Sequence, residues 1–123
     1  MRIVIPTNTP DGLLAKRGAH FGKAPFYVIV DVENGEIKDV DFTTNPGHSG
    51  GACGNAVSNI KNLGADALIV IGIGPNPLMG FKQLCIKVYK DDNSPTVEES
   101  IKKFLNNELI EMTPDMSCSA HKF

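Results

Sequence analysis

The run Ala67-Leu68-Ile69-Val70-Ile71 is apolar at every position, and it constrains the fold more than any other segment of the chain. A strand with no polar side belongs in the centre of a sheet that is covered on both faces. A second strand-like run, residues 85–89, follows after a segment that can form a short helix. Parallel strands need such a crossover connection, so the chain predicts an α/β fold built around a parallel pair.

Three further strands are predicted in the first part of the chain, at residues 2–6, 26–32 and 36–44. The dipeptide Asn34-Gly35 between the last two is a strong signal for a tight hairpin turn, so these two strands run antiparallel. The strand at 36–44 alternates apolar and polar residues, and its expected buried side chains are Ile37, Val40 and Phe42.

Three helices are predicted from apolar residues that recur at a period of 3.6. The first spans residues 52–63. The second begins with Asn76 as its N-cap and Pro77 as its first helical residue. The third, residues 97–105, follows Thr96, which has the spacing of a capping box.

These elements combine into an α/β domain of three layers. Its mixed five-stranded sheet has the order 3-2-1-4-5, with strand 2 antiparallel, and about three helices cover it. We assign residues 1–111 to this domain and residues 112–123 to a polar, flexible C-terminal tail.

The composition is ordinary for a folded soluble domain, with 41% hydrophobic and 21% charged residues. The formal net charge of −2 argues against nucleic acid as a partner, because phosphates are bound by clustered Lys and Arg. No apolar run approaches the ~20 residues that span a bilayer, and the first residues lack the apolar segment of a signal peptide. We therefore expect a cytoplasmic protein without a membrane partner.

The cysteines do not form a recognisable framework. The chain has an odd number of cysteines, which lie far apart in sequence: Cys53, Cys85 and Cys118. Because there is also no Cys-x-x-Cys pair, neither a disulfide scaffold nor a zinc ribbon is indicated. Cys85 opens the strand at 85–89, where we expect it in the core.

The predicted topology places the candidate chemistry at one edge of the sheet. The loops at the carboxyl ends of strands one, three and four span residues 7–25, 45–51 and 72–76. Open α/β sheets bind ligands at such an edge, near the point where the strand order reverses. The residues of unusual chemistry fall in these same loops.

His20, Phe21 and Gly22 form the first candidate group, just ahead of the second strand. A neutral imidazole is a common metal ligand, and an adjacent glycine lets a ligand approach the backbone. The alternative is a histidine that only orders its own loop through hydrogen bonds. One histidine does not decide between the two.

His48, Gly50, Gly51 and Cys53 form the second group, at the start of the first predicted helix. Glycines that lead into a helix expose N–H groups suited to an anion, and the helix dipole favours a thiolate at Cys53. A thiolate and an imidazole together are a ligand set for a soft metal. In the alternative, Cys53 is a small core residue and His48 is a solvated loop residue.

Gly72, Gly74 and Asn76 form the third group, in the turn after the central strand. This turn looks like a shortened phosphate loop, but it has the spacing of neither the dinucleotide fingerprint nor the P-loop. In the tail, Cys118 and His121 are two further soft ligands three residues apart, whereas a structural zinc site needs four. The alternative for them is a disordered tail without a metal.

No constellation of catalytic residues emerges from the sequence. The strand at 2–6 carries no carboxylate, which argues against the two-metal site of a nuclease. There is also no nucleophile elbow, no His-Glu-x-x-His motif and no Walker lysine. We therefore expect a protein that is not an enzyme.

Several segments, in order and spacing, resemble the accessory family of nitrogenase iron–molybdenum cofactor synthesis. Together they cover about residues 1–111. They are Arg2-Ile3-Val4-Ile5-Pro6-Thr7, His20-Phe21-Gly22-Lys23-Ala24-Pro25-Phe26, Val30-Asp31-Val32-Glu33-Asn34-Gly35-Glu36-Ile37, Asn45-Pro46, Gly72-Ile73-Gly74-Pro75-Asn76, Ile86-Lys87-Val88-Tyr89 and Thr96-Val97-Glu98-Glu99.

The resemblance implies a ribonuclease H-like α/β/α domain that binds or carries an iron–sulfur or iron–molybdenum-type cluster, or a cofactor precursor. It also implies His20 as the residue that contacts the cluster, and proteins that donate and accept the cluster as partners. The alternative function is a regulatory module, unrelated to nitrogen fixation, that binds a small anion or another protein.

Overall fold

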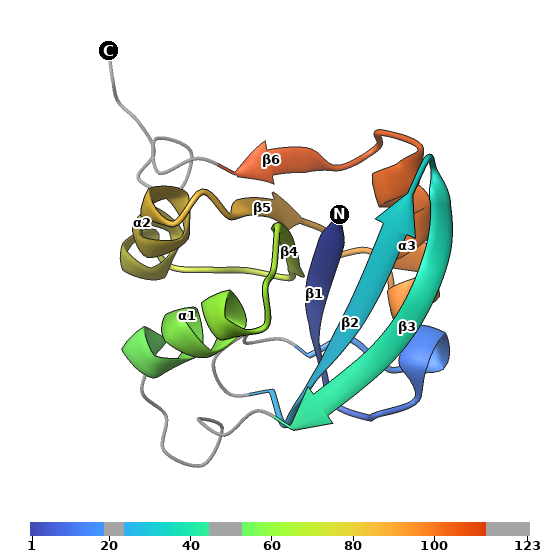
Figure 1. Cartoon of the computed structure of the whole chain (residues 1–123), viewed down its shortest axis with the longest axis horizontal. Coiled ribbons are helices and arrows are strands. Elements are labelled where there is room, and N and C mark those ends of the chain that lie inside the picture. Colours follow the sequence, from blue (N-terminus) through green and yellow to red (C-terminus); the bar gives the residue numbers. More distant parts are fainter. Residues whose placement is uncertain (19–23, 45–52, 113–123) are drawn as a thin grey trace.

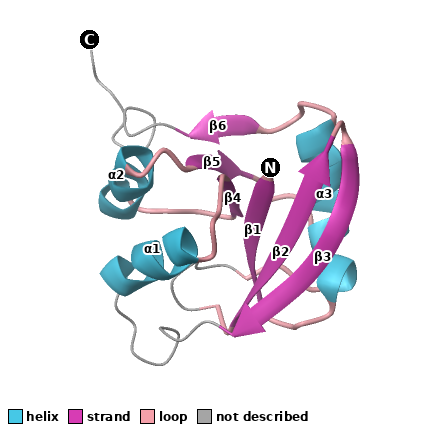
Figure 2. Ribbon diagram, viewed as in Figure 1, coloured by secondary structure: helices cyan, strands magenta, loops and turns pink. Residues whose placement is uncertain are grey.

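The sheet of the protein is twisted and carries helices on both faces (Figures 1 and 2). This computed structural model describes residues 1–18, 24–44 and 53–112, and for residues 53–56 the backbone alone. The strand order is β3-β2-β1-β4-β5-β6. The predicted α/β class and the predicted order of five strands are confirmed, and β6 adds a sixth strand that was not predicted.

Four strands, β1, β3, β4 and β5, point the same way, whereas β2 and β6 run antiparallel to their neighbours. Met112, which we place in the tail from the sequence, pairs with Val88 as part of β6. The strands are β1 (Arg2–Thr7), β2 (Phe26–Glu33), β3 (Glu36–Thr44), β4 (Ala67–Val70), β5 (Lys87–Lys90) and β6 (Ile110–Met112).

The helices divide between the two faces. On one face, α1 (Cys53–Asn62) and α2 (Pro75–Gln83) pack Ile60, Leu78 and Phe81 against the sheet. On the other face, α3 (Val97–Leu105) packs Val97 and Ile101, beside the short 3-10 helix η1 (Gly12–Leu14). No described helix is long and apolar enough to cross a membrane.

The two faces explain why the central strand is apolar throughout. Leu68 and Val70 of β4 enter the core beneath α1 and α2, whereas Ala67 and Ile69 enter the core beneath α3. All four are buried, as the sequence predicted. A polar residue at any of these positions would lose its water without gaining a partner.

The hairpin between β2 and β3 forms at the predicted dipeptide. Asn34 and Gly35 have φ of 56° and 80°, the left-handed conformation that a two-residue hairpin turn requires. The prediction that β3 buries Ile37, Val40 and Phe42 is wrong, because Phe42 is 47% and Ile37 is 36% exposed and Val40 is half-buried. β3 is the outermost strand of the sheet and has a neighbour, β2, on one side only.

Helix α2 begins two residues earlier than predicted. Its N-cap is Gly74 and its first residue is Pro75, so Asn76 lies inside the helix rather than capping it. Proline suits this first position because its ring fixes a helical φ and its missing N–H is not needed there. Thr96 is the N-cap of α3 as predicted, but its side chain makes no capping hydrogen bond.

Cys85 does not lie in a buried strand, contrary to the prediction. It is exposed, has a φ of 62° and follows the end of α2, while β5 begins only at Lys87. Cys85 therefore takes the left-handed position that often ends a helix.

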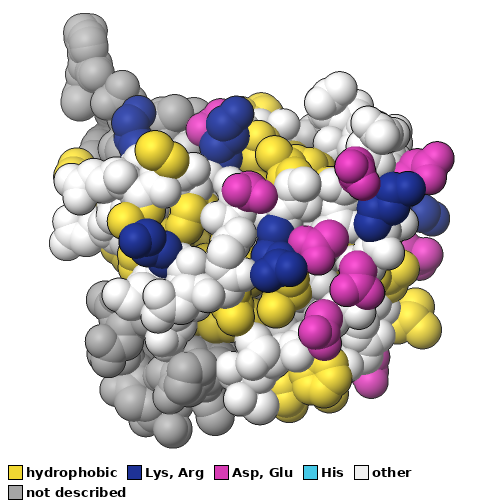
Figure 3. Space-filling view, in the orientation of Figure 1, with side chains coloured by type: hydrophobic (Ala, Val, Ile, Leu, Met, Phe, Trp, Pro, Cys, Tyr) yellow, Lys and Arg dark blue, Asp and Glu magenta, His cyan; other side chains and the backbone are white. Residues whose placement is uncertain are grey.

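Arg2 connects the start of β1 to β2 and to the residue that follows α1. Its Nε donates to Asp31 Oδ1 at 2.9 Å and its Nη2 donates to Asp31 Oδ2 at 3.2 Å. Its Nη1 donates to the carbonyl oxygen of Leu63 at 2.8 Å. Charges of both signs mix on the described part of the face in Figure 3, where Asp and Glu gather over β2 and β3.

Replacing Phe81 by alanine tests the packing of this core. Phe81 is fully buried beneath α2, so we expect Phe81→Ala to lower the free energy of unfolding by about 3–5 kcal/mol. Phe42→Ala, at a half-exposed position on β3, is the matched control and should cost about 1 kcal/mol or less. Urea unfolding followed by circular dichroism measures both, and equal losses would contradict the burial described here.

Candidate functional site

The ends of four neighbouring strands lie at the edge where β1 finishes. Thr7 at the end of β1 pairs with Phe26 at the start of β2, and Phe26 pairs with Thr44 at the end of β3. β4 runs parallel to β1 on its other side and ends at Val70. We call the ends at Thr7, Phe26, Thr44 and Val70 the site edge. All three loops predicted to carry chemistry begin or end here.

The structure describes part of the predicted site. Gly72, Gly74 and Asn76 lie directly after β4 at the site edge, and Cys53 is the first residue of α1. The remaining candidates lie outside the described residues, so their roles stay predictions: His20, Phe21, Gly22, His48, Gly50, Gly51, Cys118 and His121.

Residues 15–18 form a short strip along the end of β1. The N–H of Asn8 donates to the carbonyl oxygen of Lys16 at 2.8 Å, and the N–H of Gly18 donates to that of Pro6 at 2.9 Å. The Asn8 side chain adds a bond from Nδ2 to the carbonyl oxygen of Arg17 at 3.3 Å. The strip is therefore joined to the sheet although it belongs to a loop.

The other side of the strip is held by the segment that precedes α3. The N–H of Arg17 donates to the carbonyl oxygen of Pro95 at 3.0 Å, and the N–H of Val97 donates to that of Ala15 at 3.1 Å. An isolated bridge between Lys16 and Thr96 lies between these two bonds. The strip thus connects the end of β1 with the start of α3.

Gly18 and Ala24, which flank residues 19–23, pack directly against each other. A Cβ atom added to Gly18 would lie 2.8 Å from the Cβ of Ala24, closer than two carbon atoms approach without displacement. Position 18 requires glycine because there is no room for a side chain, and not because its backbone has a positive φ. The two ends of the loop that carries His20 in the sequence therefore meet at the site edge.

The Arg17 side chain is buried behind the strip. Its Nη1 donates to Ser100 Oγ at 2.7 Å and to the carbonyl oxygen of Ser94 at 3.3 Å, and it lies 3.6 Å from Asp91 Oδ2. The side chains of Arg17 and Asp91 are only 2% and 1% exposed. Among the described residues, Arg17 Nε and Nη2 have no hydrogen-bond partner.

Asp91 is the centre of this buried network. It accepts hydrogen bonds from Ser100 Oγ at 2.9 Å and from the N–H of Asn93 at 3.1 Å, and Lys103 Nζ lies 3.6 Å away. Burial by itself raises the pKa of Asp91. The nearby Ser94 side chain, these hydrogen bonds and the charge of Arg17 outweigh burial and hold the pKa below its ordinary value.

Burial has the opposite effect on the cation. It lowers the pKa of Arg17, and the negative charges of Asp91 and Asp92 partly offset that decrease. A guanidinium begins so far above neutrality that it stays protonated in the physiological range. Arg17 and Asp91 therefore form a charged pair inside the protein at neutral pH.

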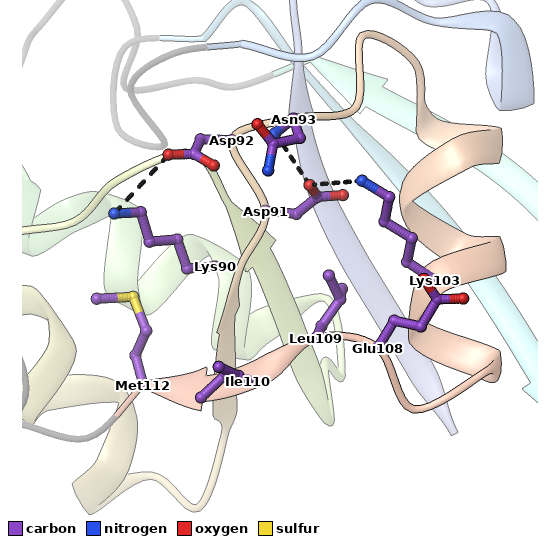
Figure 4. Close-up of a pocket in the computed structure, with 9 residues that line it drawn as sticks. All are labelled: Lys90, Asp91, Asp92, Asn93, Lys103, Glu108, Leu109, Ile110 and Met112. Carbon is purple, nitrogen blue, oxygen red and sulfur yellow. Dashed lines mark hydrogen bonds and ion pairs between the residues drawn. The ribbon is translucent and has the colours of Figure 1, made fainter.

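Asp91 also lines a cavity of about 470 Å³ at the carboxyl end of β5 (Figure 4). Within its wall, Lys90 lies 3.9 Å from Asp92, and Lys103 lies 3.6 Å from Asp91. Because these opposite charges pair with each other, the cavity presents no cluster of one sign. It does not by itself indicate a class of ligand.

The turn after β4 is a poor site for an anion. Pro75 and Pro77 have no N–H group, and the N–H of Leu78 already donates to the carbonyl oxygen of Gly74 at 3.2 Å. Asn76 therefore carries the only N–H group among the first three helical residues, whereas phosphate sites use several. A Cβ added to Gly72 would meet no atom of the described residues within 4 Å, so they leave the space at this turn open.

The described residues alone do not form a metal site. No group of three or more His, Cys, Asp or Glu residues within residues 1–18, 24–44 and 53–112 is arranged to hold a metal ion. A metal site at this edge would therefore depend on the predicted donors His20, His48 and Cys53. Imidazole and thiolate are the donor types that suit soft transition metals.

The sequence analysis missed the buried network of Arg17, Asp91 and Ser100. All three residues stand in polar stretches that predict solvated loops and helix faces. No spacing or motif marks them, because they come together only when β1, β5 and α3 pack. The only feature of the sequence that could have indicated this network is the position of Arg17, three residues before His20.

The fold and the strand ends that meet at the site edge define a class of small α/β domains with a mixed sheet and a candidate ligand site at one edge of it. Residues 1–107 match the profile of a family described as "Dinitrogenase iron-molybdenum cofactor". The chain therefore belongs to the dinitrogenase iron-molybdenum cofactor family, and the resemblance noted from its motifs is confirmed.

Relatives of known sequence or structure agree with this assignment. An uncharacterised protein of Methanocaldococcus jannaschii is 38% identical over 111 residues, which are 89% of each chain. The crystal structure of PH0822 has a TM-score of 0.77 at 28% identity and covers 91% of this chain and 96% of that chain. The apo form of the orange protein from Desulfovibrio gigas has a TM-score of 0.72 at 26% identity, with coverages of 90% and 92%.

A double-mutant cycle tests the contact at the base of the loop. We expect Gly18→Ala to lower the free energy of unfolding by about 1–3 kcal/mol, because its new methyl group overlaps that of Ala24. Gly18→Ala combined with Ala24→Gly should recover most of the loss. Gly72→Ala, where a Cβ meets nothing within 4 Å, is the control. Additive losses without recovery in the double variant would contradict the contact.

Acid should destabilise the protein through Asp91. Its folded pKa lies below the ordinary value of 3.8, so its stabilising contribution is present above pH ~4 and is lost as the pH falls through the lowered pKa. The pKa of Asp31, which is lowered chiefly by the hydrogen bond from Arg2, acts in the same direction.

We therefore expect Asp91→Asn to lower the free energy of unfolding at pH 7 by on the order of 3 kcal/mol, as for a broken buried pair. The variant should also lose less stability than the wild type between pH 5 and pH 2, a window of about one decade or more on either side of the usual carboxyl pKa. Chemical unfolding across this pH series measures both effects. Parallel pH curves would show that Asp91 does not carry the linkage.

Proposed function

We propose that this protein is a non-catalytic carrier that binds an iron–sulfur-type metal cluster, or a cofactor precursor, as cargo at the site edge. The observation that supports the proposal is the contact between Gly18 and Ala24, which brings together at the end of β1 the two residues that flank positions 19–23 in the sequence. Membership of the iron-molybdenum cofactor family supports the class of cargo.

The proposed donors stand next to described residues in the sequence. His20 is two residues from Gly18, which lies at the site edge. Cys53 opens α1, where the helix dipole favours thiolate. His48 follows Thr44, the last residue of β3, by four residues. We propose that these three side chains bind one ligand together.

The partners in this proposal are proteins that donate the cluster and proteins that accept it. A carrier of this kind does not transform its cargo, so it needs donor side chains but no acid, base or nucleophile. The alternative of a small-anion module is less supported, because Pro75 and Pro77 remove N–H donors from the turn that would hold the anion. We further propose a cytoplasmic location.

Anaerobic reconstitution with ferrous iron and sulfide tests the proposal, with uptake followed by visible absorption and by iron analysis. We expect the wild type to take up a cluster, and His20→Ala and Cys53→Ser to weaken uptake about tenfold or more, as for the loss of a metal ligand or its support. The matched control is Cys85→Ser, since Cys85 is exposed and precedes β5 at the opposite edge of the sheet.

Two outcomes would reject the assignment. The first is a wild-type protein that takes up no cluster. The second is uptake by His20→Ala and Cys53→Ser at the wild-type level. A loss of uptake in Cys85→Ser equal to that in Cys53→Ser would point to nonspecific thiol chemistry and would also count against the site. Cys118→Ser and His121→Ala show whether the tail adds ligands.

A further inference from the structure

We propose that Arg17 is a positioning residue for the site edge. Its buried guanidinium holds Gly18 against Ala24, and we call this pair of residues the base of the loop. The inference deepens the proposed function and rests on it, because the geometry that Arg17 would control is that of the bound cargo. Arg17 itself would not contact the cargo.

The main chain of Arg17 transmits any displacement directly to Gly18. Arg17 is held on one side by the bridge to Thr7 and on the other by its N–H bond to Pro95 at 3.0 Å. The next residue is Gly18, whose packing against Ala24 leaves no room for even one methyl group. Such tight packing cannot absorb a shift of residues 15–18 without displacing Ala24.

The side chain of Arg17 reaches three separate segments. It contacts Asp91 after the end of β5, the carbonyl oxygen of Ser94 in the following loop and the hydroxyl of Ser100 in α3. Ser100 connects the charges, since its Oγ accepts from Arg17 at 2.7 Å and donates to Asp91 at 2.9 Å. The guanidinium of Arg17 therefore sets the distance between residues 15–18, which lie beside β1, and the segments that follow β5.

This arrangement is better suited to fixing geometry than to adding stability. Two buried charges lose their hydration, and Arg17 Nε and Nη2 recover no hydrogen bond from the described residues. Apolar side chains of similar size often replace such buried pairs without loss of stability. Groups that orient a ligand-bearing segment, by contrast, commonly control affinity without touching the ligand.

Arg2 provides a matched control. It lies at the start of β1, whereas Arg17 lies beside the end of β1. It also pairs with an aspartate, Asp31, and bonds a carbonyl oxygen, that of Leu63. The Arg2 side chain is 42% exposed, however, and lies at the edge opposite the candidate site. Changing either arginine removes an ion pair that joins two segments, but only Arg17 adjoins the base of the loop.

The test compares Arg17→Met, Arg17→Lys and Arg2→Met with the wild type in anaerobic titration with ferrous iron and sulfide. We expect Arg17→Met to raise the iron and sulfide concentration for half-maximal uptake about 10- to 100-fold. Arg17→Lys should recover part of the affinity, because an ammonium group can still reach Ser100 and Asp91. Arg2→Met should lower the melting temperature but leave uptake at the wild-type level.

Nuclear magnetic resonance provides a readout that does not depend on the cargo. The amide shift of Ala24, which is adjacent in sequence to neither substituted residue, should change in Arg17→Met and stay unchanged in Arg2→Met. If Arg17→Met does not fold, Ser100→Ala takes its place, because it removes the hydroxyl that links Arg17 to Asp91 and should weaken uptake in the same direction.

The outcomes separate the two proposals. A wild-type protein that takes up no cluster overturns the carrier function and this inference with it. A wild type that binds, together with an Arg17→Met variant that binds equally well, overturns the positioning role alone. Equal losses of uptake in Arg17→Met and Arg2→Met also overturn it, because the effect would then follow from general destabilisation.

Discussion

The burial of β1 and β4 on both faces is the constraint on which the rest of the structure depends. Ile3 and Ile5 enter one core and Val4 enters the other, and the residues of β4 alternate in the same way. Neither face can meet water without exposing a row of apolar side chains, at roughly 25 cal/mol for each Å². Helices must therefore cover both faces, and the connections between elements lie at the ends of the strands.

From this constraint follows the position of the candidate site. Parallel strands covered by helices send their loops out at the same edge, so the ends of β1, β3 and β4 meet the start of β2 there. The strip at residues 15–18 then joins that edge to the start of α3 by main-chain bonds on both sides. The buried pair of Arg17 and Asp91 completes this connection next to the candidate site.

The sequence predicted those elements whose local signals agree with their tertiary surroundings. The apolar run of β4 and the Asn34-Gly35 turn are examples, because each permits only one conformation. Phe42 shows the reverse case: its strand was predicted, but β3 is the outermost strand of the sheet and leaves Phe42 exposed. The start of α2 was predicted two residues late because two prolines near it both suit a first helical position.

The sequence by itself determined the fold class, the family and the loops in which candidate donors stand. Periodicity, turn dipeptides and motif order are local properties, and they survive without knowledge of which elements touch. Only the tertiary structure decided that Gly18 meets Ala24 and that Arg17 meets Asp91 and Ser100. Arg17 and Ser100 are 83 positions apart, and no local energy term couples residues at that separation before the sheet has formed.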